Sequence, residues 1–165
     1  MGEFTHFDGD GNAIMVDVSE KKDTIREAVA AGTISLSEQC YLKVKEGKMA
    51  KGDVLGIART AGIMAAKKTS DLIPLCHIIN LTKVTVKFSL NDEDCTITAE
   101  CLAKSVGKTG VEMEALTGVS VTLLTIYDMC KAIDRGMFVN NIELKRKSGG
   151  KSGSWERNDC YEGYI

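Results

Sequence analysis

One aspartate and one lysine near the end of a long helical pattern have the spacing that acid–base chemistry can use. Asp128 and Lys131 are three residues apart, so on a helix they share a face and their side chains can touch. A carboxylate and an amine that emerge from an apolar stripe shift each other's pKa, as proton transfer requires. Ordinary surface salt bridges have the same spacing. The pair alone therefore leaves a catalytic and a structural interpretation open.

The helix that would carry this pair is predicted over residues 108–135. Its apolar residues recur every three or four positions, which is the period of a helix face turned toward a core. Gly136 follows directly and is expected to end the helix in a left-handed conformation. The stripe that we expect to be buried consists of Val119, Leu123, Ile126, Cys130 and Ile133.

Two segments rich in glycine and lysine are candidates for binding an anion. GKTG at 107–110 lies at the start of the long helix, and KSGGKSG occupies 147–153. Each resembles the end of a P-loop but lacks the earlier glycine that this motif requires. Their backbone amides and lysines can still contact phosphate groups. Glu112 and Glu114 fall in the first helical turn, where the helix dipole alone is enough to favour carboxylates.

A single histidine in an apolar loop also has two interpretations. His77 lies in the segment 70–80, which contains the only proline, Pro74. Proline cannot continue a helix, so this segment is predicted to be a buried connection. A histidine in such a place is more often a hydrogen-bonded structural group than a catalyst.

The composition is that of a globular protein without a nucleic-acid or membrane surface. The 165 residues are 44% hydrophobic and 27% charged, with a net charge of −2, which argues weakly against nucleic-acid binding. No apolar run is long enough to span a membrane, and the N-terminus lacks the pattern of a secretory signal. We therefore expect a cytoplasmic protein. Six scattered cysteines without a CxxC pair, and only two histidines, make a zinc site unexpected.

The remaining patterns predict an α+β fold in two layers. The expected order is strand, two helices, hairpin, helix and strand, which is the split βαβ pattern of a ferredoxin-like sandwich. Such a fold has an antiparallel four-stranded sheet with helices packed on one face. Residues 1–14 and 154–165 are expected to be flexible, and 15–153 to form a single catalytic domain. The expected elements begin with a helical or irregular arm at 15–32 and a strand at 33–36. Two helices follow: one has a Ser35–Glu38 capping box and ends near 46, and the other spans 54–68 and is capped by Asp53. The remaining strands are expected at 82–90, at 95–101 and at 138–147, the last with Ile142 and Leu144 turned inward.

Four long strings give the chain a resemblance to a known family. They are MVDVSEKKDTIREA at 15–28, KGDVLGIARTAGIMAAKKTSDLIPLCH at 51–77, GKTGVEMEALTGVSVTLLTIYDMCKA at 107–132 and KSGGKSG at 147–153. With these strings the chain resembles molybdenum cofactor biosynthesis protein C, the family of cyclic pyranopterin monophosphate synthases.

The resemblance implies a specific reaction. The family rearranges 3′,8-cyclo-7,8-dihydroguanosine 5′-triphosphate to cyclic pyranopterin monophosphate and releases pyrophosphate, as a lyase that uses no metal or redox cofactor. It also implies a homo-hexamer, a trimer of dimers, with the active site at a subunit boundary.

The resemblance further implies which residues form the site. Asp128 corresponds to the residue usually assigned as catalytic, and we expect Lys131 and Lys51 to exchange protons with it. We expect lysines to stabilise the charge that builds on pyrophosphate as it leaves. The substrate-binding residues that we expect are Leu75, Cys76, His77, Glu112, Met113, Glu114, Lys67, Lys147 and Lys151.

Two other classes of function fit the same fold. An RNA-recognition module would need exposed aromatic residues on its central strands, whereas the strands here offer only Phe88, on the apolar face. A regulatory domain could bind a nucleotide in a lysine-rich pocket without turnover, and fold alone does not separate it from an enzyme.

Overall fold

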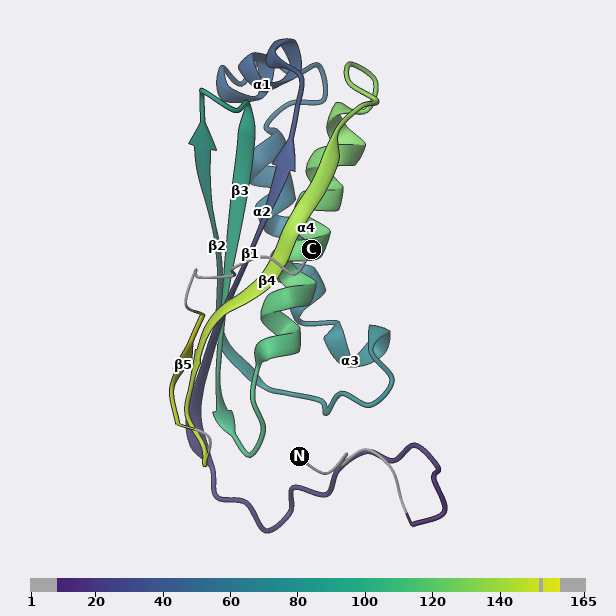
Figure 1. The fold of residues 1–165 in the computed structure, drawn as a ribbon, viewed down its shortest axis with the longest axis vertical. Coiled ribbons are helices and arrows are strands. Elements are labelled where there is room, and N and C mark those ends of the chain that lie inside the picture. The colour runs from purple at the N-terminus through teal and green to yellow at the C-terminus, as the bar shows by residue number, and fades with distance from the viewer. Residues whose placement is uncertain (1–8, 152, 158–165) are drawn as a thin grey trace, which may run out of the picture.

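The computed structural model describes residues 9–151 and 153–157, which form one antiparallel sheet covered by helices. The sheet has the strand order β2-β3-β1-β4-β5, and every neighbouring pair is antiparallel. The long helices α2 and α4 lie on one face of it (Figure 1). The elements are β1 (Thr24–Ser35), α1 (Glu38–Lys45), α2 (Val54–Ala66), α3 (Thr69–Leu72), β2 (Leu81–Asn91), β3 (Thr96–Gly107), α4 (Glu112–Cys130), β4 (Phe138–Ser148) and β5 (Trp155–Glu156).

The ferredoxin-like prediction is confirmed, with one additional strand. The order β2-β3-β1-β4 and the helices after β1 and β3 are the split βαβ arrangement. The short strand β5 adds to the edge of the sheet, where Trp155 pairs with Lys147. Residues 1–8 and 158–165 of the two ends that were expected to be flexible lie outside the described part. No described helix has the length and hydrophobicity to cross a membrane.

The first strand is much longer than the sequence indicated. An irregular or helical arm was expected at 15–32, yet β1 begins at Thr24 and is the central strand of the sheet. Alanine favours helices when no tertiary contact decides, but here Ala28 and Ala30 are buried between the two flanking strands and the helices. Small residues are needed here, because a Cβ on Gly32 would lie 2.8 Å from Leu123 of α4.

Helix α4 buries the predicted stripe but is shorter than predicted. Val119, Leu123 and Ile126 are fully buried, whereas Ile133 lies beyond the helix end. The helix begins at Glu112 and ends at Cys130, with Lys131 as its C-cap, so Gly136 does not terminate it. Beyond the helix, the amides of Ile133 and Asp134 both donate to the Cys130 carbonyl and close a tight turn.

Smaller corrections concern the connections. Helix α1 is preceded by Ser37 as its N-cap, so the expected capping box at Ser35 is wrong, whereas the Asp53 cap of α2 is confirmed, with a 2.9 Å bond from the Gly56 amide. The segment 70–80 is not buried throughout, because it contains part of α3 and its Ile78 is 92% exposed. In β4, Leu144 packs against the core as predicted, whereas Ile142 at the sheet edge stays 41% exposed.

Helices α2 and α4 cross at a pair of glycines, which gives a testable prediction. A Cβ on Gly62 would lie 2.8 Å from the carbonyl of Gly118 and also collide with the Thr122 hydroxyl. We expect Gly62→Ala to lower the free energy of unfolding by about 1–2 kcal/mol, because overpacking outweighs the better helix propensity of alanine. Denaturant unfolding measures this change. Gly107→Ala is the matched control, since a Cβ there meets nothing within 4 Å; an equal loss in both variants would contradict the crossing argument.

Candidate active site

The three residues expected to transfer protons lie together at the C-terminal end of α4. The Lys131 ammonium is 2.7 Å from one carboxylate oxygen of Asp128, and the Lys51 ammonium is 3.6 Å from the other. Lys51 also donates to the backbone carbonyl of Asp128 at 3.0 Å. We call these three residues the acid–base cluster.

The antiparallel packing of α2 on α4 brings Lys51 to this cluster. Gly62 in α2 meets Gly118 and Thr122 in α4, so the turn before α2 lies at the C-terminal end of α4. Lys131, with a smaller contribution from Lys51, holds the pKa of Asp128 below its usual range. Asp128 in turn raises the pKa of Lys131. The cluster therefore combines a carboxylate that can accept a proton with an ammonium that can donate one.

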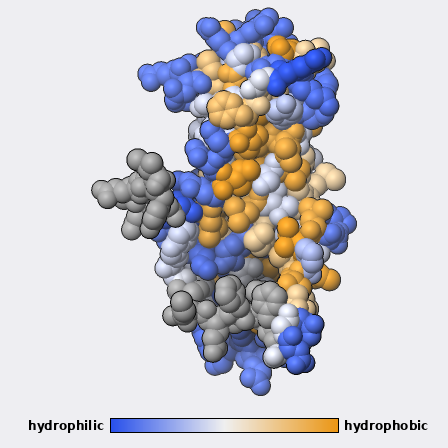
Figure 2. All heavy atoms as spheres, turned by 45° about the vertical axis from the view of Figure 1, so that its right-hand side comes forward, coloured by the Kyte–Doolittle hydropathy of each residue, from blue (hydrophilic) through white to orange (hydrophobic). Residues whose placement is uncertain are grey.

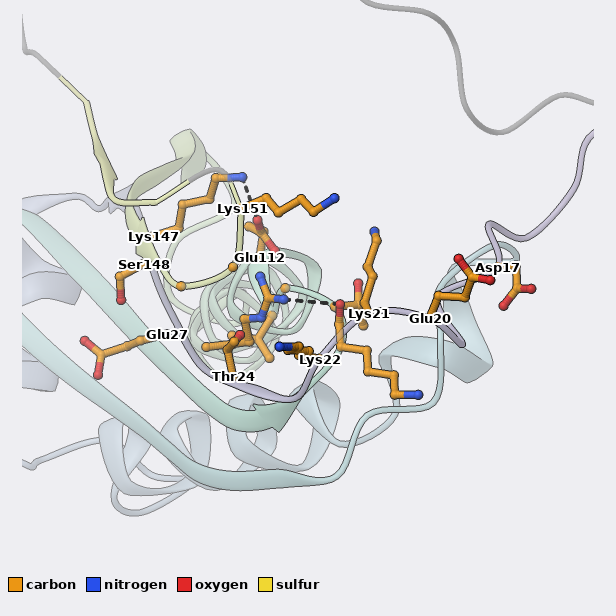
Figure 3. A pocket seen from close by; sticks show the side chains of 17 residues that line it. Asp17, Glu20, Lys21, Lys22, Thr24, Glu27, Glu112, Lys147, Ser148 and Lys151 are labelled. Atoms are coloured by element: carbon orange, nitrogen blue, oxygen red, sulfur yellow. Dashed lines mark hydrogen bonds and ion pairs between the residues drawn. The ribbon is translucent and has the colours of Figure 1, made fainter.

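The N-terminal end of α4 carries a large basic hollow of about 1050 Å³ (Figure 3). Both glycine-rich segments predicted from the sequence, 107–110 and 147–153, contribute to its lining, with residues 108–110 and 147–151. Within its lining, the Lys147 ammonium lies 2.9 Å from the carboxylate of Glu112 in α4, as the dashed line in Figure 3 marks. The charged residues that line the basic hollow are Lys21, Lys22, Arg26, Lys108, Lys147 and Lys151, together with Asp17, Glu20, Glu27 and Glu112.

Arg26 joins the two glycine-rich segments. Its guanidinium donates to the carbonyls of Gly107 and Lys108 at 3.4 and 3.2 Å. Gly149 and Gly150 pass directly beside it with φ angles of 103° and 72°. A Cβ on Gly149 would collide with the Ile25 carbonyl, and one on Gly150 would collide with the guanidinium itself. Glycine is needed at both positions for conformation and for space.

A smaller hollow of about 450 Å³ continues from the first one. The two hollows share Lys21, Thr109, Gly110 and Glu112 in their linings. The loop after α3 and the first turn of α4 form its walls. Six of the predicted binding residues line it, namely Leu75, Cys76, His77, Glu112, Met113 and Glu114.

Glu114 is the buried acid of this smaller hollow. Its side chain is only 3% exposed, and desolvation raises its pKa to about 7, with a further contribution from the nearby Glu112. Glu114 can therefore donate or accept a hydrogen bond near neutral pH, a property suited to the amino and carbonyl groups of a heterocycle.

The raised pKa predicts a pH-dependent stability. In the folded chain Glu114 holds its proton up to about pH 7, whereas in the unfolded chain a glutamate loses it near pH 4.3. The stabilisation by proton binding is complete below the unfolded pKa and is lost as the pH rises toward 7. We expect Glu114→Gln to be more stable than the parent at pH 8, by about 1–2 kcal/mol after solvent screening, and equally stable at pH 4.

Urea unfolding at both pH values measures this difference. Glu100→Gln controls for the loss of a charge, because Glu100 lies exposed on β3. A pH-independent difference between parent and Glu114→Gln would show that the carboxyl does not hold its proton in the folded chain.

Three cations of the site, Lys21, Lys22 and Arg26, were missed as site residues from the sequence. They line the basic hollow, but the segment 15–32 was expected to be a helical or irregular arm. Lys108, which also lines the hollow, was expected only as part of the glycine-rich segment GKTG. If β1 had been recognised, its pairing with β3 would have placed Arg26 near the segment 107–110, because Thr24 of β1 pairs with Gly107 of β3. Conversely, Lys67 lies at the C-terminal end of α2 and lines neither hollow.

The acid–base cluster and the hollows lie at opposite ends of the same helix. Asp128 follows Glu112 by 16 residues in α4, which corresponds to about 24 Å along the helix axis. Neither aspartate nor lysine can extend over that distance. Within the described residues, no three or more His, Cys, Asp or Glu side chains are grouped so that they could hold a metal ion.

Comparisons with known proteins agree over almost the whole chain. The model of the MoaC family matches residues 15–150. A protein of Heliobacterium modesticaldum named cyclic pyranopterin monophosphate synthase is 57% identical over 159 residues, covering 96% of this chain and all of the relative. Proteins of the same name from Clostridium botulinum and Thermomicrobium roseum are 56% and 55% identical, covering 93% and 96% of this chain and 96% of each relative. The chain belongs to the MoaC family.

Proposed function

We propose that this chain is a cyclic pyranopterin monophosphate synthase of molybdenum cofactor biosynthesis. It rearranges 3′,8-cyclo-7,8-dihydroguanosine 5′-triphosphate to cyclic pyranopterin monophosphate and releases pyrophosphate. The observation that carries this assignment is the identity of 53–57% with relatives of that name over at least 93% of the chain. The geometry supports it, because the chain provides a proton-transfer cluster, a cationic hollow and an apolar-walled hollow.

The acid–base cluster is suited to the ring chemistry. Opening the guanine-derived ring and closing a new one requires several proton transfers, for which an ionised Asp128 and a protonated Lys131 are a matched pair. Lys51 contacts both the carboxylate and the carbonyl of Asp128, so it can orient the carboxylate or act as a second acid. We propose Asp128, Lys131 and Lys51 as the catalytic residues.

The basic hollow is suited to the triphosphate. Closing the cyclic phosphate forms a bond between a ribose oxygen and the α-phosphorus, breaks the bond to the β-phosphate, and passes the hydroxyl proton to a base. Negative charge accumulates on the departing pyrophosphate, which fixed cations stabilise. We assign this role to Lys147 and Lys151 with Lys21 and Arg26. Lys67 lines neither hollow, and it remains only a candidate for an outer contact with the phosphates.

The smaller hollow is suited to the heterocycle. Leu75 and Met113 supply apolar surface against a ring, and Cys76 adds a thiol whose pKa is raised by burial. Glu112 and Glu114 supply partners for the ring amino and carbonyl groups. No step in this scheme calls for an electron carrier, so the proposal includes no redox cofactor and no metal.

We further propose that the working form is a homo-hexamer, a trimer of dimers, in which two subunits share each site. Two observations support shared sites: the long separation of the acid–base cluster from the hollows, and the apolar side chains exposed on both long helices. Figure 2 shows hydrophobic residues gathered in a band along one side of the molecule. Ile57 and Met64 of α2 and Leu124 of α4 are 47%, 61% and 60% exposed, as contacts with another copy would require.

Two coarser assignments complete the proposal. Residues 15–153 act as one catalytic domain, since the hollows draw on segments from its beginning, middle and end. The enzyme acts in the cytoplasm, where GTP-derived substrates are found.

The reaction itself provides the test. Purified protein is incubated with the cyclised dihydro-GTP, and pyrophosphate and the pterin product are measured together. Equal amounts of both products, formed over many turnovers, are expected. Tight binding of the compound without pyrophosphate release would overturn the enzyme assignment and favour a nucleotide sensor.

A further inference from the structure

The segment before β1 crosses both hollows as an exposed strap. We define this N-terminal strap as residues 16–22, which alternate between two environments. Val16 and Val18 are half-buried and line the smaller hollow, whereas Asp17 and Glu20 are exposed and line the basic one. Lys21 lines both hollows and so lies where they join.

Two side chains from the loops beneath the hollows hold the strap. His77 Nε2 lies 2.8 Å from the Val16 carbonyl, and Lys108 Nζ donates to the Ser19 carbonyl at 2.6 Å. A carbonyl only accepts, so the Nε2 atom of His77 carries a proton and donates it. The strap's own bonds, from the Ser19 amide to Asp17 and from the Lys21 amide to Val18, close a small turn within it.

These contacts fix the strap at two points, one just before that turn and one within it. The carbonyls of Val16 and Ser19 are held, and Lys21 lies two residues after Ser19, at the end of the hydrogen-bonded turn. The positions of the His77 and Lys108 side chains therefore determine where the strap backbone lies. The strap backbone in turn determines where the ammonium of Lys21 lies. A misplacement of about 1 Å in such a group can lower turnover by about 100-fold.

We propose that His77 and Lys108 are positioning residues that act on the reaction through the strap. They hold it so that Lys21 lies between the triphosphate and the heterocycle. His77, which also lines the smaller hollow, is thus assigned a backbone partner, the Val16 carbonyl. This inference rests on the proposed function for its effect on turnover, while the anchoring of the strap is independent of it.

The conservative variant separates positioning from proton transfer at His77. The amide nitrogen of glutamine can donate from about the place of Nε2, but an amide does not exchange a proton near neutral pH. We expect His77→Ala to raise KM for the cyclised dihydro-GTP by about 10- to 100-fold, and His77→Gln to recover most of that loss with an unchanged pH profile. His77→Gln as inactive as His77→Ala would overturn the positioning role.

Lys108 is tested in the same way, with a lysine away from the hollows as its control. Lys108→Met keeps the length of the side chain and removes the donor, so we expect a rise in KM similar to that of His77→Ala. Lys87→Met, on the exposed side of β2, should leave KM unchanged. Since both residues act through one strap, KM of the double variant should be little higher than KM of the more strongly affected single variant. If the effects of the two substitutions on KM were fully additive in free energy, the two residues would contact the substrate independently.

A measurement without substrate completes the test. Limited trypsin digestion of the full chain, read by mass spectrometry, reports cleavage after Lys21 and Lys22 relative to cleavage after Lys48. Lys48 lies in an exposed turn away from the strap. We expect strap cleavage to accelerate by about 3- to 10-fold in His77→Ala and Lys108→Met, as expected for one lost hydrogen bond, and to stay at the parent rate in His77→Gln.

The two measurements distinguish the possible failures. Unchanged strap cleavage in both variants would overturn the positioning role even if activity were lost. Accelerated cleavage in a protein whose parent releases no pyrophosphate would support the anchoring of the strap and overturn the proposed reaction instead.

Discussion

Replacement of Asp128 with asparagine is expected to lower pyrophosphate release by about 10²- to 10⁴-fold while the protein stays folded. Asparagine keeps the shape of aspartate and can still accept a hydrogen bond from Lys131, but it cannot take a proton. The carboxylate is also what raises the pKa of Lys131, so the variant loses a base and changes the pKa of the neighbouring ammonium, which falls. The loss should fall on kcat more than on KM, because the hollows that bind the substrate are at the other end of α4.

The chain contains a matched control for this prediction. Asp71 forms an exposed ion pair with Lys68 at 3.3 Å, with the same spacing of three residues as Asp128 and Lys131. Exposed pairs of this kind contribute little to stability, so Asp71→Asn should retain the parent rate. Full activity in folded Asp128→Asn would show that the cluster is an ordinary salt bridge, and equal losses in both variants would point to a general structural effect.

What sequence can predict about this site depends on how local the feature is. Asp128 and Lys131 are neighbours on one helix, so their spacing alone places them in contact. Lys51 is 77 residues from Asp128, and its contact follows only from the antiparallel crossing of α2 on α4. The glycines at that crossing are visible in the sequence, but which two of them meet is a property of the packed fold.

The basic hollow shows the opposite limit. Its cations come from the strap, β1, the loop before α4 and the end of β4. Composition identified the glycine-rich segments as anion-binding candidates, but Lys21 and Arg26 lie in a stretch whose alanines favour a helix locally. The sheet decides otherwise, because β1 pairs along its length with β3 and over most of its length with β4. Local propensity therefore failed where long-range strand pairing determines the structure.

Mixing two inactive variants is expected to restore activity, if each site takes its acid–base cluster from one copy and its hollows from another. Asp128→Asn keeps intact hollows, and Lys147→Met keeps an intact cluster while losing the ammonium that reaches Glu112. When equal amounts of the two chains are unfolded and reassembled together, random pairing gives about one site in four with both parts native. We expect activity to rise from near zero to about a quarter of the parent value.

Verified mixed assembly is the control that gives this experiment its force. Different affinity tags on the two variants allow mixed oligomers to be purified, and light scattering should give a mass about six times the 17.9 kDa of the chain. Variants reassembled separately and then combined should stay inactive. Because about 24 Å of helix separates Asp128 from Glu112, a single chain is not expected to complete a site alone. Mixed oligomers that remain as inactive as their parents would mean that each chain completes its own site, and the separation along α4 would then need a conformational change to bring its two ends to one substrate.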